Sequence, residues 1–156
     1  MADADKTLIT RAQVTSVINT TTKRCALVLD GQTIEIGNTG WRDVSASLDP
    51  AKVGTITAGM LVAIRDGNTV TIKINVTPTV SGNVQITLTG LGTGFAPDTA
   101  LFDQGRGGAV GVSTAGHVYI NPAVAGTAVS GLLSFVTDNA WLSSLPGVEL
   151  GQPVVV

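Results

Sequence analysis

Residues 60–76, MLVAIRDGNTVTIKINV, carry the clearest β-hairpin pattern in the chain. Two runs of alternating side chains flank Asp66-Gly67-Asn68, and Asp-Gly between such runs is a strong signal for a tight hairpin turn. The apolar residues of the returning run share one face: Val70, Ile72, Ile74 and Val76. This stretch therefore predicts two antiparallel strands with one buried face.

Similar runs lie on both sides of this hairpin. ALVLDGQTIEIG (26–37) is a second pattern with a central Asp-Gly, and NVQITLTGL (83–91) alternates like a half-buried strand. Further strand patterns are AVGVSTAGHVYINP (109–122) and AVSGLLSFV (128–136). Short strands about 8–12 residues apart, separated by Gly, Asn and Asp, are typical of a sandwich, jelly roll or barrel. We predict an all-β fold, an antiparallel β-sandwich or jelly-roll-like domain.

The predicted core takes the apolar phase of each alternating run. Its members are Val28, Ile34, Ile64, Val70, Ile72, Ile74, Ile86, Leu88, Val118, Ile120, Leu133 and Phe135. Cys25 is the only cysteine, so an intrachain disulfide is impossible. Its position in the apolar run RCALVLD favours a small buried hydrophobe over a reactive thiol.

The N-terminal 22 residues depart from the strand pattern. Leu8, Ala12, Thr15 and Ile18 are three or four residues apart, and Asp5 can cap a helix there. The many Thr and Val residues argue against a stable isolated helix, so an extended arm is the alternative. We predict an oligomerisation or attachment arm over residues 1–22 and a β-sandwich domain over residues 23–156. The arm's predicted contact residues are Leu8, Ile9, Val14, Val17 and Ile18.

The composition favours self-association and argues against several partners. Only 13% of the 156 residues are charged, and an uncharged surface of this kind is commonly buried between subunits. A net charge of −2 provides no basic field for nucleic acid. No apolar run approaches the length of a membrane span, and the start MADADKTLIT lacks the features of a secretion signal. We predict a homo-oligomer with neither a nucleic-acid partner nor a membrane span.

Residues that could carry catalysis are sparse. His117 is the only histidine and begins a strand pattern, and no serine lies in a GxSxG context. The acidic residues considered for catalysis all lie in turn-like settings: Asp43, Asp49, Asp98, Asp103, Asp138 and Glu149. GLGTG (90–94) and QGRGGAVG (104–111) lack the helix and lysine of a phosphate-binding loop, which favours turns. We therefore predict a protein that is not an enzyme and uses no metal or cofactor.

Five segments between Gly40 and Gly147 form a longer pattern. They are GWRDVSASL (40–48), AIRDGNTVTIKI (63–74), LGTGFAPDTALF (91–102), GHVYIN (116–121) and GLLSFVTDNAWLSSLPG (131–147). Their order resembles a β-domain found near the C-termini of minor tail proteins of phages of actinobacteria. In that family a proline stands at the position of Leu142 and an arginine at the position of Ala96.

The resemblance implies a non-enzymatic virion structural protein of the minor-tail, host-surface-binding type. It also implies a homotrimer on the virion surface, made in the host cytoplasm, whose partners are other virion proteins and a host-envelope glycan. The alternative is a capsid decoration or head-fibre protein that stabilises the shell. From another class, a carbohydrate-binding or glycan-cleaving module stays open, and a glycan-cleaving enzyme would need two carboxylates in one cleft.

The two tryptophans lie near the two ends of the matching region. Because a buried indole removes a large apolar area from water, Trp41 and Trp141 are predicted to close the ends of the domain by packing. The alternative for Trp141 is an exposed platform for a ligand. Thr137, Asp138 and Asn139 are predicted to form the turn before it. The predicted contact residues of this corner are Trp141, Leu142, Leu145 and Pro146.

Overall fold

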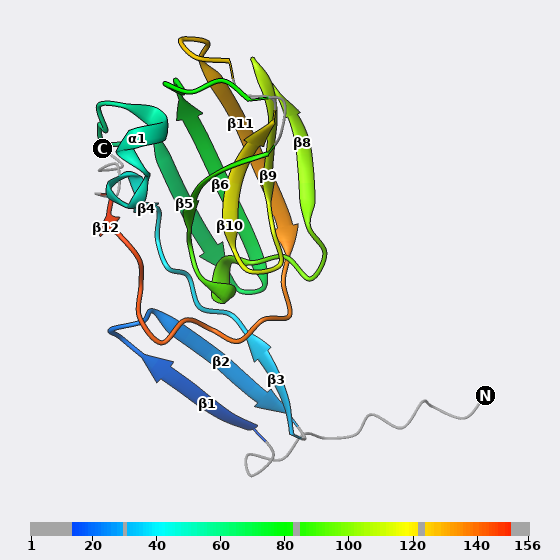
Figure 1. Cartoon of the computed structure of the whole chain (residues 1–156). Helices are drawn as coiled ribbons and strands as arrows, with labels where there is room; N and C mark the ends of the chain where they lie inside the picture. Colours follow the sequence, from blue (N-terminus) through cyan, green and yellow to red (C-terminus); the bar gives the residue numbers. More distant parts are fainter. Residues whose placement is uncertain (1–13, 30, 83–84, 122–123, 151–156) are drawn as a thin grey trace, which may run out of the picture.

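The computed structural model describes residues 14–29, 31–82, 85–121 and 124–150. Within them the chain forms three antiparallel sheets of three, four and five strands. The two larger sheets pack face to face, and the small sheet lies at one end of this sandwich (Figure 1). The predicted antiparallel β-sandwich is confirmed, whereas the strand order does not establish a jelly roll.

The small sheet has the order β1-β2-β3, with β1 at Val14–Asn19, β2 at Arg24–Leu29 and β3 at Gln32–Glu35. The β2–β3 hairpin is the second Asp-Gly hairpin expected from the sequence, with Leu29 paired to Gln32. Residues 14–19 form a strand rather than a helix, because β1 pairs along its whole length with β2. The predicted domain boundary near Lys23 therefore lies in the turn between two paired strands.

The five-stranded sheet contains the hairpin quoted first. Its order is β11-β6-β5-β4-β12. The bounds are β4 Arg42–Asp43, β5 Leu61–Asp66, β6 Thr69–Val76, β11 Val129–Val136 and β12 Val148–Glu149. Strands β5 and β6 pair antiparallel from Leu61–Ile74 to Asp66–Thr69, as the sequence predicts.

The four-stranded sheet has the order β7-β10-β9-β8. The bounds are β7 Ile86–Gly90, β8 Leu101–Gly105, β9 Gly108–Val112 and β10 His117–Asn121. Three strands form a meander and β7 lies beside the third of them, which is a Greek-key order. Each large sheet thus contains a three-stranded meander and one strand that arrives from the other sheet, and the five-stranded sheet also has β12 beside β4.

Helical segments are short in this fold. They are η2 Ser45–Ser47, α1 Pro50–Val53 and η3 Thr93–Phe95. Asp49 caps α1 by accepting a hydrogen bond from the Ala51 N–H. In the described ranges no helix is long and apolar enough to span a membrane.

The hydrophobic core lies between the two large sheets. Eight of the twelve predicted core residues are buried there: Val70, Ile72, Ile74, Leu88, Val118, Ile120, Leu133 and Phe135. Ile86 is partly buried against this core. The prediction is wrong for Ile64, which is half-buried because β5 turns Leu61, Ala63 and Arg65 inward instead.

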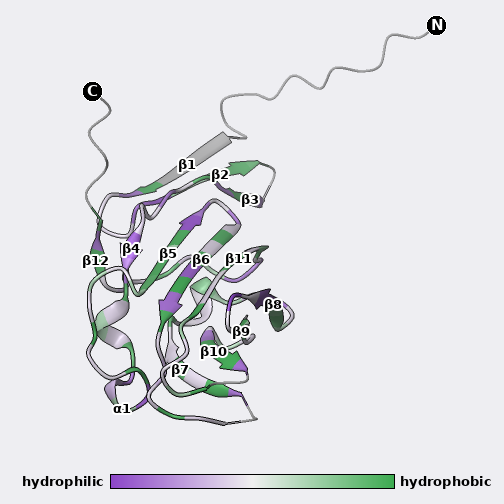
Figure 2. Cartoon of the chain, turned by 90° about the horizontal axis from the view of Figure 1, so that it is seen from above, coloured by the Kyte–Doolittle hydropathy of each residue, from purple (hydrophilic) through white to green (hydrophobic). Residues whose placement is uncertain are grey.

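Among the described side chains, none from the small sheet belongs to this core cluster, which explains why the prediction is also wrong for Val28 and Ile34. Ile34 is 45% exposed and Val28 is half-buried, because their strands belong to the third sheet. Cys25 lies in the same sheet and is half-buried rather than buried. Coloured by hydropathy, the small sheet lies beside the sandwich with apolar segments in its strands (Figure 2).

The turn between β8 and β9 reaches across to the other large sheet. The backbone N–H of Arg106 donates to the Ser130 carbonyl at 2.8 Å, and Ser130 returns the bond at 3.0 Å. Gly107 makes this approach possible, since its φ is +81° and a Cβ there would collide with the Ala128 carbonyl. The glycine-rich QGRGGAVG stretch is therefore the turn that the sequence predicts.

Candidate functional site

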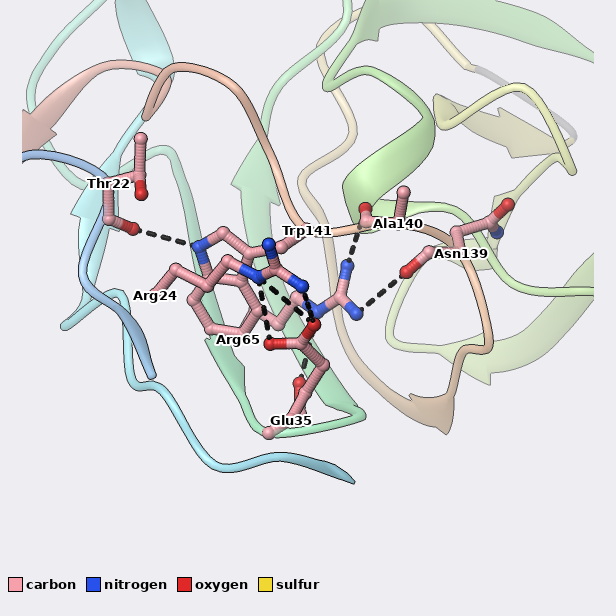
Figure 3. Close-up of polar contacts among 8 residues, drawn as sticks. Thr22, Arg24, Glu35, Arg65, Asn139, Ala140 and Trp141 are labelled. Carbon is pink, nitrogen blue, oxygen red and sulfur yellow. Dashed lines mark hydrogen bonds and ion pairs between the residues drawn. The ribbon is translucent and has the colours of Figure 1, made fainter. Parts of the chain in front are cut away.

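The most elaborate polar site in the described chain surrounds Arg65 at the end of β5. Its side chain is fully buried (0% exposed), and its guanidinium donates to four backbone carbonyls. The acceptors are the oxygens of Gly67 (3.0 Å), Gly94 (2.8 Å), Ala140 (3.1 Å) and Asn139 (2.8 Å). These four residues belong to the β5–β6 turn, to η3 and to the loop after β11. Arg65 thus ties together the β5–β6 turn, η3 and the loop after β11. Figure 3 shows its bonds to Asn139 and Ala140 of that loop.

Trp141 packs directly against this guanidinium. The Arg65 Cζ atom lies 4.8 Å from the centre of the indole ring, and Trp141 as a residue is only 8% exposed. The indole Nε1 donates to the Thr22 carbonyl at 2.9 Å, which connects the sandwich to the turn after β1. The packing interpretation of Trp141 is therefore correct. Trp41, by contrast, is 38% exposed and does not close the opposite end.

An ion pair from the small sheet lies beside the same site. Arg24 Nη2 is 2.6 Å from Glu35 Oε1, and Arg24 Nε also donates to this carboxylate. These hydrogen bonds raise the pKa of Arg24. Burial lowers the pKa of Arg65, and the Glu35 carboxylate opposes that shift. An arginine pKa starts so far above neutrality that Arg65 stays charged.

A second arginine repeats this arrangement at the C-terminal end of the sandwich. Arg42 Nε donates to the Pro146 carbonyl at 3.0 Å, and its Nη2 donates to the Gly147 carbonyl at 2.8 Å. Its Nη1 also lies 3.6 Å from a Glu149 oxygen. Both arginines therefore hold loop carbonyls, and neither guanidinium is free to act on a substrate.

The predicted contact residues fall into three groups. Leu8 and Ile9 lie outside the described residues, and Val14 and Val17 lie in β1. Ile18 is 70% exposed. The members of the corner after β11 are mostly used internally: Trp141 is buried, Leu142 packs against the core, and Leu145 and Pro146 are half-buried.

The remaining polar residues that the structure describes do not gather into a reactive site. His117 is exposed at the start of β10, beside Gly90. Partial burial tends to raise the pKa of Asp43, but hydrogen bonds from Ser45 and Gly59 lower it overall, so this carboxylate stabilises a loop. Among residues 14–29, 31–82, 85–121 and 124–150, no three His, Cys, Asp or Glu side chains are placed to hold a metal ion.

One open groove is lined by two basic side chains and by no acidic one. It has a volume of about 700 Å³ on the outer side of β6 and β11, and its lining residues are Lys73, Ile74, Asn75, Arg106, Ser130, Gly131 and Leu132. The five other described basic side chains contact a carboxylate or buried carbonyls. Lys73 and Arg106 form no such contact with any described residue, and the lining contains no acid. The groove is therefore suited to an anionic group.

Sequence reasoning missed the centre of the polar site. Arg65 was visible only as an arginine in an otherwise apolar strand just before an Asp-Gly turn. Its partners are backbone carbonyls, and carbonyls leave no signature in a sequence. Comparison of the chain with protein-family models, curated proteins and solved structures gives no match.

Proposed function

We propose that this chain is a non-enzymatic structural protein of a phage particle. In this proposal it is a minor-tail-type subunit that self-associates on the outer surface and contacts the host envelope. One observation supports it most: the segments that resemble the phage tail family meet at Arg65 and Arg42. AIRDGNTVTIKI supplies Arg65, LGTGF supplies the Gly94 carbonyl, and NAWLSSLPG supplies the remaining loop acceptors. The shared residues therefore serve architecture, which is what a structural subunit needs.

The test of location is the copy number of the protein in purified virions, measured by quantitative mass spectrometry against the major capsid protein. We expect a few copies per particle, as for a tail component. A number close to that of the capsid subunits would overturn the tail assignment in favour of a decoration or head-fibre protein. Absence from virions, or release of reducing sugars from host cell walls by the purified chain, would overturn the structural role itself.

The groove that contains Lys73 and Arg106 is the surface we assign to host contact. Its two basic side chains can pair with carboxylates of an anionic glycan, while Asn75 and Ser130 can bond hydroxyls. The groove is open rather than enclosed, so one site would bind weakly. Several copies on one particle would raise the overall affinity through avidity.

This assignment predicts salt-sensitive binding to an acidic polysaccharide. Immobilised polygalacturonate should retain the protein at low ionic strength, and neutral dextran should not. The double substitution Lys73→Ala with Arg106→Ala should weaken retention by about tenfold, because it removes both unpaired charges. The double substitution Lys23→Ala with Lys52→Ala is the matched control, since it also removes two positive charges and both lysines lie near acidic residues outside the groove. Equal weakening by the control would mean that only net charge matters.

A further inference from the structure

The small sheet has an inverted distribution of polar and apolar side chains. Its charged pair, Arg24 and Glu35, lies on the face toward Trp141 and Arg65, together with the fully buried Ala26. Because side chains alternate along a strand, the residues that precede and follow Ala26 and Glu35 lie on the opposite face. That second face, here called the apolar face, contains Ile18, Cys25, Leu27, Leu29, Ile34 and Ile36, with Gln32 at its end, and the register also places Val14 and Ser16 of β1 on this side.

Three isoleucines of the apolar face are exposed, while Cys25, Leu27 and Leu29 are half-buried. Ile18 is 70% exposed, Ile34 is 45% exposed and Ile36 is 49% exposed. None of the isoleucines and leucines described on this face belongs to the core cluster or packs against it. With three strands about 4.8 Å apart and up to six residues long, the face covers on the order of 300 Å². This is comparable to the largest apolar patch of a typical soluble monomer, about 300–600 Å², and such patches are often functional.

The absence of charge on the apolar face and its sheet geometry indicate which partner it can bind. It carries no charged side chain, so it offers nothing for an acidic or basic partner to recognise. A sheet with one apolar face is stable when a second layer covers that face, and another sheet is the usual second layer. The same face of a second copy has matching polarity, matching size and matching strand geometry. A symmetric contact through one patch used twice is also the commonest way in which identical subunits associate.

We propose that the apolar face of the small sheet is the interface through which copies of this chain associate. Two such faces stack as sheet on sheet, about 10 Å apart, and bury Ile18, Ile34 and Ile36 of each copy. This inference rests on the self-association in the proposed function and adds the surface that produces it. The face alone is smaller than the roughly 800 Å² per partner of a standard interface, so the association should depend on concentration.

The test compares two neighbouring residues of β3 in the full-length chain. Ile34→Lys places a charge on the apolar face, whereas Thr33→Lys places it on the opposite face of the same strand, where Thr33 is also exposed. By analytical ultracentrifugation the wild type should sediment as an oligomer. Ile34→Lys and Ile18→Lys should raise the dissociation constant by at least about 100-fold, because stacking would bring like charges together without partners. Thr33→Lys should leave it unchanged.

A second control and a second measurement distinguish the outcomes. Leu132→Lys changes an apolar residue that is 55% exposed on β11, away from the small sheet, and should keep the wild-type mass. Cys25 lies on the apolar face, so its reaction with a maleimide should be slow in the wild-type oligomer and faster in Ile34→Lys. Circular dichroism of the variants checks that they remain folded, which exposed positions should permit.

Each result has one meaning. If the wild type is an oligomer and Ile34→Lys keeps its mass, the apolar face is not the interface, although self-association still holds. If Thr33→Lys or Leu132→Lys dissociates the oligomer as strongly as Ile34→Lys, the assignment to this face is wrong. A wild type that stays monomeric at high concentration overturns both this inference and the self-association, while the virion assignment is decided separately by copy number.

Discussion

Replacing Arg65 with methionine is expected to destabilise the folded chain by about 4 kcal/mol. Methionine can fill the space of the side-chain stem, but it leaves the carbonyls of Gly67, Gly94, Asn139 and Ala140 without the donors that Arg65 supplies. Each unsatisfied buried acceptor costs about 1–3 kcal/mol, and relaxation of the exposed loop after β11 recovers part of this. For a chain of this length the midpoint of thermal unfolding should fall by about 10 °C.

Two further variants isolate the cause. Arg65→Lys keeps the charge, but one ammonium group cannot reach three separate segments, so most of the loss should remain. Arg106→Met is the matched control, because Arg106 is exposed and contacts no carboxylate among the described residues. It should change stability by no more than about 0.5 kcal/mol. A thermal midpoint for Arg65→Met equal to that of the control would show that the buried guanidinium is dispensable.

Substituting alanine for Trp141 should destabilise the chain by about 3–4 kcal/mol. The change removes the indole from a buried site, its contact with the Arg65 guanidinium, and its hydrogen bond to the Thr22 carbonyl. Trp141→Phe keeps an aromatic ring but not the Nε1 donor, so it should cost only about 1 kcal/mol. Urea unfolding followed by circular dichroism measures both values.

Hydrogen exchange of the same two variants should also distinguish the local stability of the small sheet from that of the sandwich. Because Trp141 bonds to the turn between β1 and β2, its loss should speed amide hydrogen exchange in β2 more than in β6. Exchange that accelerates equally in both strands would mean that Trp141 stabilises the chain only globally. Unchanged unfolding of Trp141→Ala would contradict the packing interpretation altogether.

The strands were predictable because their signals are local. Alternation and Asp-Gly turns depend on neighbouring residues, and the β5–β6 and β2–β3 hairpins form where those signals lie. The inward phase of β5 was not predictable from apolarity, because one of its three inward residues is the charged Arg65. Val62, which is only 8% exposed, and the half-buried Ile64 alternate with these inward residues, so the wrong phase looked more apolar. A buried arginine in a short strand can therefore make the inward face look less apolar in the sequence than the other face.

The small sheet was predicted only in part, for a different reason. The sequence identified its β2–β3 hairpin but placed Val28 and Ile34 in the main core. Which layer receives an apolar face depends on tertiary packing, and strand alternation does not contain that information. Similarly, Trp141 could be recognised as a packing residue, whereas its bond to Thr22 joins atoms that lie 119 residues apart.

The dependence of the Arg65 site on main-chain acceptors has a consequence for divergence. A carbonyl oxygen survives most substitutions of its own residue, so positions such as the exposed Ala140 can change without loss of the hydrogen bond. The same freedom extends to Asp138, Ser143 and Ser144, whose side chains are exposed along this loop. Related chains could therefore drift far apart along the loop while a single arginine kept its path constant. In such a lineage the fold is kept after the similarity between the sequences has been lost.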